Sequence, residues 1–186
     1  MSLEITPSLR GALGELYYKE GCEQKGWAYI SLENIHNAAI ESAAFKDSNI
    51  LVFKKGFHRI TIKLMDGLVS EVKEIARPTN NSKENPSFVF DYLACKVGQL
   101  KQYDGIMLAN PTAICWVEIK TGGSTFSDNQ IRALERIKLP LAVFHIEDVL
   151  APPRRIEMEW DIRSGKEWLD ELDDLRDQAE SDDDYF

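Results

Sequence analysis

Histidine and cysteine, the side chains that bind zinc and form disulfides, are scarce in this sequence, with three of each among 186 residues. Cys22, Cys95 and Cys115 are odd in number, and no two of them form a Cys-x-x-Cys pair. His36 and His58 lack ligand spacing to any other histidine or cysteine. These scarcities argue against a disulfide framework and a structural zinc site, and they favour a reducing compartment.

Long apolar runs are lacking as well. No stretch approaches the ~20 apolar residues that span a bilayer. The N-terminal sequence MSLEITPSLR has no basic and then apolar segment of the kind found in signal peptides. Apolar residues make up 44% of the chain and charged residues 28%, which is typical of a globular domain. We therefore expect a cytoplasmic protein with no membrane partner.

Basic residues are too few to balance the acidic ones, and the net charge is −9. Residues 167–186 hold ten acidic residues and one arginine, so this segment accounts for the whole imbalance. The rest of the chain is neutral, and a neutral body can bind nucleic acid through a local basic patch. We expect one domain over residues 1–178 and an acidic tail without fixed structure over residues 179–186.

The sequence does contain alternating helical and strand-like patterns. Apolar spacing predicts helices over residues 8–25, 31–49, 66–76 and 127–137, and a last helix from residue 164. Short β-rich runs predict strands over residues 50–53, 57–64, 88–96, 103–108, 114–120, 139–146 and 156–162, with turns at Gly56, Gly98 and Asn110-Pro111. These elements indicate an α/β (α+β) protein whose central mixed sheet is flanked by helices. We expect residues 31–87 to form an inserted helix–hairpin–helix region.

Charged residues interrupt the apolar run Ile114-Cys115-Trp116-Val117-Glu118-Ile119-Lys120. Side chains alternate along a strand, so Glu118 and Lys120 share one face. A turn at Asn110-Pro111 would bring Asp104, fourteen positions before Glu118, to the same end of the sheet. Charges on a central strand covered on both faces are costly unless they are paired or functional. Asp91 is a rival to Asp104, but a whole strand separates it from Glu118, which favours Asp104.

The set Asp104, Glu118 and Lys120 resembles the core motif of the PD-(D/E)xK nuclease superfamily. Two further pieces fit the resemblance: Glu15 in the first helix, and Gln130 near the start of a later helix, as in Holliday-junction-resolvase-like endonucleases. The order of the pieces along the chain is that of the family. The resemblance covers residues 8–25 and 88–149. It departs from the family name at Tyr103, where proline is expected.

The resemblance implies a restriction-endonuclease-like fold and a metal-dependent endonuclease that hydrolyses phosphodiester bonds in DNA, in repair, recombination or restriction. The implied catalytic residues are Asp104, Glu118, Lys120, Glu15 and Gln130. Of these, the three acids would bind Mg²⁺ or Mn²⁺ together with the backbone carbonyl of Ile119, because both ions prefer oxygen ligands. Lys120 would orient water or stabilise phosphate charge. A homodimer is expected by analogy alone, and RNA is an alternative substrate.

Basic residues of the expected hairpin are the candidate nucleic-acid surface: Lys54, Lys55, Arg59 and Lys63. The alternative is an ordinary solvated strand face whose lysines guard an edge. The lack of interleaved aromatic and basic residues favours this alternative.

The catalytic candidates have structural explanations too. Glu15 can pair with Lys19 at i+4 on a solvated helix. Gln130 can form a capping box with Ser127, and the Glu-x-Lys pair can be an exposed ion pair. The alternative function is a nuclease-fold protein without catalytic activity that binds protein or nucleic acid through its acidic C-terminus.

Overall fold

The computed structural model describes residues 6–82, 84–103, 106–146 and 161–183. Its centre is one seven-stranded sheet with the strand order β3-β2-β1-β4-β5-β6-β7. The strands are β1 (Trp27–Ser31), β2 (Ile50–Lys55), β3 (His58–Lys63), β4 (Tyr92–Tyr103), β5 (Ile106–Thr121), β6 (Leu141–Ile146) and β7 (Asp161–Arg163). The expected mixed α/β class is confirmed. None of the described helices has the length and apolarity of a membrane span.

Strand pairing combines antiparallel neighbours with one parallel step at the centre. β5 and β6 run parallel, joined by a crossover that contains a helix, as the sequence predicts. All other neighbours in the strand order are antiparallel. At one end β3 also pairs in parallel with β5, with Thr61 opposite Leu108. The sheet therefore curls on itself at that end, since β3 contacts both β2 and β5.

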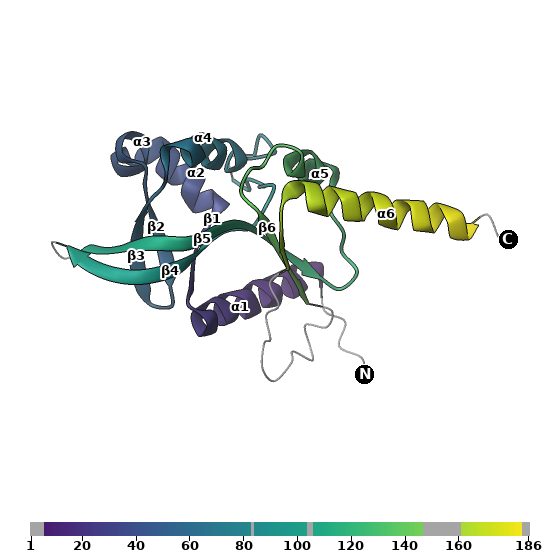
Figure 1. Ribbon diagram of the computed structural model, residues 1–186, viewed down its shortest axis with the longest axis horizontal. Helices are drawn as coiled ribbons and strands as arrows, with labels where there is room; N and C mark the ends of the chain where they lie inside the picture. The colour runs from purple at the N-terminus through teal and green to yellow at the C-terminus, as the bar shows by residue number, and fades with distance from the viewer. Residues whose placement is uncertain (1–5, 83, 104–105, 147–160, 184–186) are drawn as a thin grey trace.

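Helices cover both faces of the sheet (Figure 1). The first, α1 (Pro7–Lys25), lies alone on one face. The other face carries α2 (Leu32–Glu41), α3 (Ala43–Ser48), α4 (Asp66–Ile75) and α5 (Asp128–Leu134). The last helix, α6 (Gly165–Asp183), starts beside α5 and projects away from the body.

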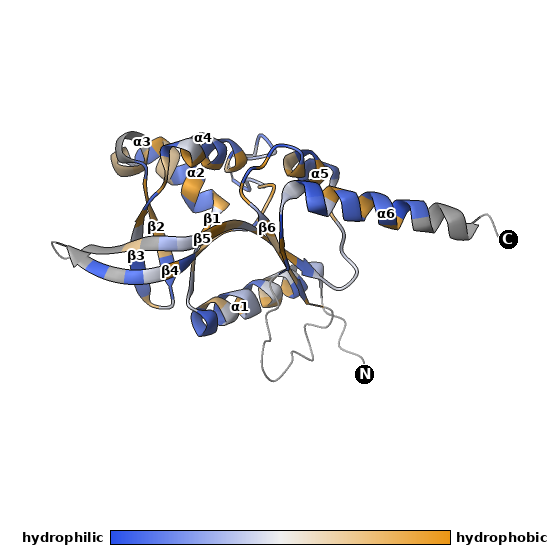
Figure 2. Ribbon diagram, in the orientation of Figure 1, coloured by the Kyte–Doolittle hydropathy of each residue, from blue (hydrophilic) through white to orange (hydrophobic). Residues whose placement is uncertain are grey.

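Alternation along β4 and β5 divides the core into two clusters. Cys115 and Val117 pack with Tyr18 of α1 on one face. Trp116, between them in sequence, packs on the opposite face with Phe90 and the residues under α2–α5. Hydrophobic residues accordingly follow the middle of the sheet, while α6 is largely hydrophilic (Figure 2). Both faces of β5 are therefore covered, as expected of a central strand.

The expected turn at Asn110-Pro111 is wrong. β5 runs without interruption from Ile106 to Thr121. Pro111 pairs with Val97 where the β4–β5 register shifts, and such an irregularity accommodates a residue that has no N–H to donate. Gly98 likewise lies within β4 rather than at a turn. One long hairpin thus replaces two short ones.

Three further boundaries differ from expectation. The sequence pattern missed β1, a five-residue strand between α1 and α2. β4 starts at Tyr92 rather than Phe88. At the C-terminus, α6 continues to Asp183, so the first residues of the expected acidic tail are helical.

All three cysteines are free thiols in the interior. Burial raises the pKa of Cys22 and of Cys95 to about 12. These thiols are therefore protonated and unreactive at neutral pH, and they serve as small core residues.

Candidate functional site

Strand β5 carries the Glu-x-Lys motif in the middle of the sheet. Glu118 and Lys120 form an ion pair of 2.9 Å, and their side chains are only 9% and 10% exposed. The alternative of an exposed pair is therefore wrong. A buried pair of this kind gains little net stability, because desolvation of both charges offsets their attraction.

Gln130 of α5 holds Lys120 in place. Lys120 Nζ donates to Gln130 Oε1 at 2.9 Å and lies 5.1 Å from the centre of the Phe126 ring. The same oxygen accepts the backbone N–H of Ser127 at 3.0 Å, which completes the predicted capping box. Gln130 Nε2 donates to the carbonyl of Val89 at 3.0 Å. Gln130 therefore caps α5 and positions the lysine at once.

Asp91 meets this group from the start of β4. Its backbone N–H donates to the Val117 carbonyl at 3.0 Å, and its Oδ2 accepts the N–H of Ile119 at 2.7 Å. Asp91 thus extends the β4–β5 ladder by one residue. Its side-chain carboxylate, rather than a backbone carbonyl, accepts the hydrogen bond from Ile119. These two bonds place its carboxylate beside Glu118, although the two residues are 27 positions apart in the sequence.

The charge of Glu118 opposes the ionisation of Asp91. Burial, the charge of Glu118 and the charge of Glu15 together raise the pKa of Asp91 to about 7, against the hydrogen bond from Ile119 and the charge of Lys120. Burial also raises the pKa of Glu118, although Lys120 and Gln130 oppose it. Two buried acids with raised pKa values and only one ammonium, which pairs with Glu118, form a site that an added cation would stabilise.

The third acid, Glu15, comes from α1 on the other face of the sheet. The preceding Gly14 lets α1 approach β5 closely: a Cβ on this glycine would lie 2.9 Å from Thr121 Cγ2 and 3.2 Å from Ile119 Cγ2. Both atoms belong to β-branched side chains with little freedom to move aside. The glycine therefore brings Glu15 within electrostatic range of Asp91.

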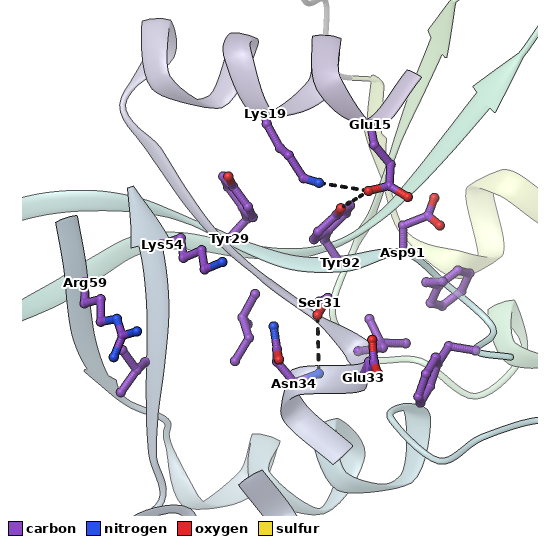
Figure 3. Close-up of a pocket in the computed structure, with 15 residues that line it drawn as sticks. Glu15, Lys19, Tyr29, Ser31, Glu33, Asn34, Lys54, Arg59, Asp91 and Tyr92 are labelled. Carbon is purple, nitrogen blue, oxygen red and sulfur yellow. Dashed lines mark hydrogen bonds and ion pairs between the residues drawn. The ribbon is translucent and has the colours of Figure 1, made fainter. Parts of the chain in front are cut away.

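Glu15 is ionised at neutral pH. It accepts hydrogen bonds from Lys19 at 2.9 Å and from the Tyr92 hydroxyl at 2.8 Å. Burial raises its pKa, but these bonds and the charge of Lys19 outweigh burial, so the pKa lies below its usual value. The predicted i+4 pair is confirmed, and the bond to Tyr92 ties the same carboxylate to β4. Figure 3 shows Glu15 and Asp91 at the same end of a cavity.

Asp104, the acid favoured by its spacing from Glu118, lies outside the described residues. Its neighbours Tyr103 and Ile106 pair at the far end of the β4–β5 hairpin, twelve residues along β5 from Glu118. Twelve strand residues span ~40 Å. Since the turn at Asn110-Pro111 does not form, Asp91 is the aspartate that the fold brings to Glu118. The available signal was its position directly after Phe88-Val89-Phe90, at the start of the strand paired with β5.

The donor set suits an oxygen-preferring cation only in part. Among the residues that the structure describes, no group of three or more His, Cys, Asp or Glu side chains is arranged to hold a metal ion. Asp91 and Glu118 offer two carboxylates, and the Ile119 carbonyl points to the same edge as its N–H, toward Asp91. Mg²⁺ retains several waters and is commonly held by one or two carboxylates. This set therefore supplies part of the oxygen ligands of a Mg²⁺ or Mn²⁺ ion, and its chemistry does not suit zinc.

The basic candidates divide into two pairs. Lys54 and Arg59 lie opposite each other on β2 and β3, and they line a cavity of about 730 Å³ together with Glu15 and Asp91 (Figure 3). Lys55 and Lys63 are not among the residues that line it. The fold thus connects half of the predicted basic surface with the acidic cluster.

Comparison with family models, with curated proteins and with solved structures finds no match for this chain.

Proposed function

We propose that the protein is a metal-dependent endonuclease that hydrolyses phosphodiester bonds in DNA. The observation that carries the proposal is the convergence of Glu15, Asp91 and Glu118 beside Lys120 and Gln130. These residues come from separate elements on both faces of the sheet. Two of the acids, Glu15 and Asp91, line one end of a cavity whose lining also includes the cations Lys54 and Arg59.

A structural role explains this cluster poorly. Asp91 lies within electrostatic range of both Glu118 and Glu15, and the cation Lys120 pairs with Glu118. Replacing such a buried pair by apolar residues is often neutral or stabilising, so stability does not account for it. Raised carboxylate pKa values in a cleft are typical of functional sites.

The residues divide the chemistry among them. A bound Mg²⁺ or Mn²⁺ would be held by Asp91, Glu118 and the Ile119 carbonyl, and it would neutralise phosphate charge and lower the pKa of bound water. Lys120, fixed by Gln130, is positioned to donate hydrogen bonds to phosphate oxygens as their charge grows. Glu15, ionised and held by Tyr92, is positioned to accept a hydrogen bond from water on the α1 side.

The finer expectations belong to the same proposal. We assign the fold to the restriction-endonuclease-like class, because the Glu-x-Lys strand lies at the centre of a mixed sheet and α5 leads from it to a parallel neighbour. We place the protein in the cytoplasm, with a role in repair, recombination or restriction. RNA has the same phosphodiester, so RNA belongs in the substrate panel.

The test is cleavage of supercoiled plasmid, single strand, flap, four-way junction and RNA with Mg²⁺ or Mn²⁺. We expect wild-type cleavage that EDTA abolishes and that Asp91→Asn, Glu118→Gln and Lys120→Met each eliminate. Asp104→Asn is the matched control, since it removes the same charge from the spacing-based candidate. Cleavage retained by Asp91→Asn and lost in Asp104→Asn would overturn the assignment of Asp91. If calorimetry detected no Mn²⁺ binding that depends on Asp91 and Glu118, the proposal of a metal-dependent enzyme would be wrong.

The second candidate is a protein that binds partners through α6 and does not cleave. The observation in its favour is that α6 projects from the body with exposed acidic residues and with Leu175 at 55% exposure (Figure 1). Such a helix offers an acidic, partly apolar surface to a basic partner. Two results together would support this candidate over the enzyme. The full chain would bind no Mn²⁺, and truncation before Asp170 would abolish binding of a protein partner.

A further inference from the structure

The cavity beside the acidic cluster is large enough to hold part of a substrate. It measures about 730 Å³ and extends from Glu15 and Asp91 to Lys54 and Arg59. Sites for drug-sized molecules span roughly 300–1,000 Å³, and a nucleotide is of that size.

We propose that this cavity binds an unpaired, single-stranded segment of nucleic acid and leads its backbone to Asp91. The inference rests on the proposed function and specifies the substrate of the same site. A cavity of this volume holds about two nucleotides, whereas a duplex requires an open groove or flat surface. The preferred substrate is therefore a single strand, a flap or a frayed end.

The cations of the cavity are available to phosphates. Lys54 and Arg59 are exposed and face each other across β2 and β3. Neither forms an ion pair with a carboxylate from the described part of the chain. An arginine and a lysine on neighbouring strands can contact successive phosphates of one backbone.

Aromatic residues form the wall between the cations and Asp91. Tyr29 is partly exposed, and its ring packs edge-on against Tyr92, with centroids 5.5 Å apart. It also packs against Tyr18 at 5.8 Å, so its orientation is fixed from two sides. Phe88 lines the same cavity and is partly exposed. A fixed ring beside a cationic groove is the arrangement on which bases of single strands stack.

The experiment measures binding without cleavage. The full chain in EDTA is titrated against a short fluorescent single-stranded DNA and against the same strand in a blunt duplex. We expect the single strand to bind at least about tenfold more tightly than the duplex. We expect Lys54→Ala/Arg59→Ala to weaken single-strand binding by about tenfold or more. Duplex binding equal to or tighter than single-strand binding overturns the proposal, as does no measurable binding of the single strand.

The matched control is Arg132→Ala/Lys138→Ala, which removes the same charge at exposed positions in and after α5. Neither residue lines the cavity, and α5 lies on the face of the sheet opposite α1 (Figure 1). Equal losses in the two double variants would reduce the effect to net charge and overturn the proposal. Tyr29→Leu adds a readout of stacking: we expect a loss of at least about fivefold, with a smaller salt dependence than for the cation variants. Because Tyr29 packs on two tyrosines, circular dichroism and melting verify the fold of that variant.

Binding and cleavage results separate the two proposals. If single-strand binding depends on Lys54 and Arg59 but no substrate is cleaved, the cavity binds single strands and the proposed nuclease activity is wrong. If blunt duplex is cleaved in an Asp91-dependent way and the cation variants leave this cleavage unchanged, the nuclease activity is supported and the role of the cavity is wrong. Both proposals hold if Asp91-dependent cleavage falls in Lys54→Ala/Arg59→Ala and favours the single strand.

Discussion

Two buried glutamates are found at the same strand, β5, and differ in their surroundings: Glu71 contacts the strand from α4, and Glu118 is part of it. Glu71 of α4 is 8% exposed and Glu118 is 7% exposed. Glu71 Oε1 accepts the Trp116 indole N–H at 3.0 Å and the Leu139 backbone N–H at 3.1 Å. Both donors belong to the apolar cluster under the helices, so Glu71 joins α4 to β5 and to the start of β6.

Glu118 has a different environment only two residues along β5 from Trp116. It pairs with Lys120 and lies beside Asp91, and its negative charge raises the pKa of Asp91. Burial is common to both glutamates, so burial alone does not mark function. What distinguishes Glu118 is the gathering of several like charges near a cavity, an arrangement that costs stability and that a cation would relieve.

The largest expected effect is on cleavage by Glu118→Gln. We expect the rate to fall by ~10²-fold or more, because the change removes one of two carboxylates that would bind the metal. The shape of the side chain is kept, so the melting temperature should stay within a few degrees of wild type. Cleavage assays and thermal melts on the same preparation test this. If the melting temperature fell sharply while the folded fraction still cleaved DNA, Glu118 would have a structural role like that of Glu71.

Glu71→Ala should show the opposite pattern. Loss of the carboxylate leaves the Trp116 and Leu139 N–H groups buried without an acceptor, which costs ~1–3 kcal/mol. At ~2–4 °C per kcal/mol for a chain of this size, the melting temperature should fall by several degrees. Mn²⁺ affinity below the transition should match wild type in calorimetry. A variant that melts normally and loses Mn²⁺ would remove the distinction between the two glutamates.

The two glycines of α1 sharpen the comparison by testing how the third acid is placed. Gly14→Ala should destabilise by ~1–2 kcal/mol, since the added Cβ meets β-branched residues of β5. Gly11→Ala should stabilise by up to ~1 kcal/mol, because its Cβ would meet nothing within 4 Å and alanine favours a helix. Urea titration measures both. Equal and positive shifts would show that α1 does not press on β5.

The smallest expected effect is the pH dependence of Asp91→Asn in EDTA. The pKa of Asp91 rises from 3.8 to about 7, so between these values the folded state holds a proton that the unfolded state lacks. Stability is therefore lost as pH rises through this window, and the asparagine, which still accepts the Ile119 N–H, escapes that loss. We expect the variant to melt a few degrees above wild type at pH 8 and close to it at pH 5. A constant difference at both pH values would contradict the raised pKa.

Local patterns predicted the parts of the site that depend on neighbouring residues. Glu118 and Lys120 share a face because side chains alternate along any strand. Gln130 caps α5 because Ser127 stands three residues before it. Glu15 pairs with Lys19 because i+4 positions adjoin on a helix. Each of these predictions uses contacts within a few residues, where backbone geometry leaves little choice.

Tertiary structure alone decided which aspartate meets Glu118. Spacing favoured Asp104 because Asn110-Pro111 suggested a turn, but pairing along β4 and β5 carries the chain straight through Pro111 at a register shift. Continued by one residue, that register sets Asp91 opposite Glu118, where the Asp91 side chain accepts the Ile119 N–H, and Gly14 brings Glu15 across from the other face. The sequence by itself determined the alternating faces, the helix caps and the central Glu-x-Lys strand. Only the long-range pairing of strands, whose energy depends on residues far apart in the chain, determined the cluster and its cavity.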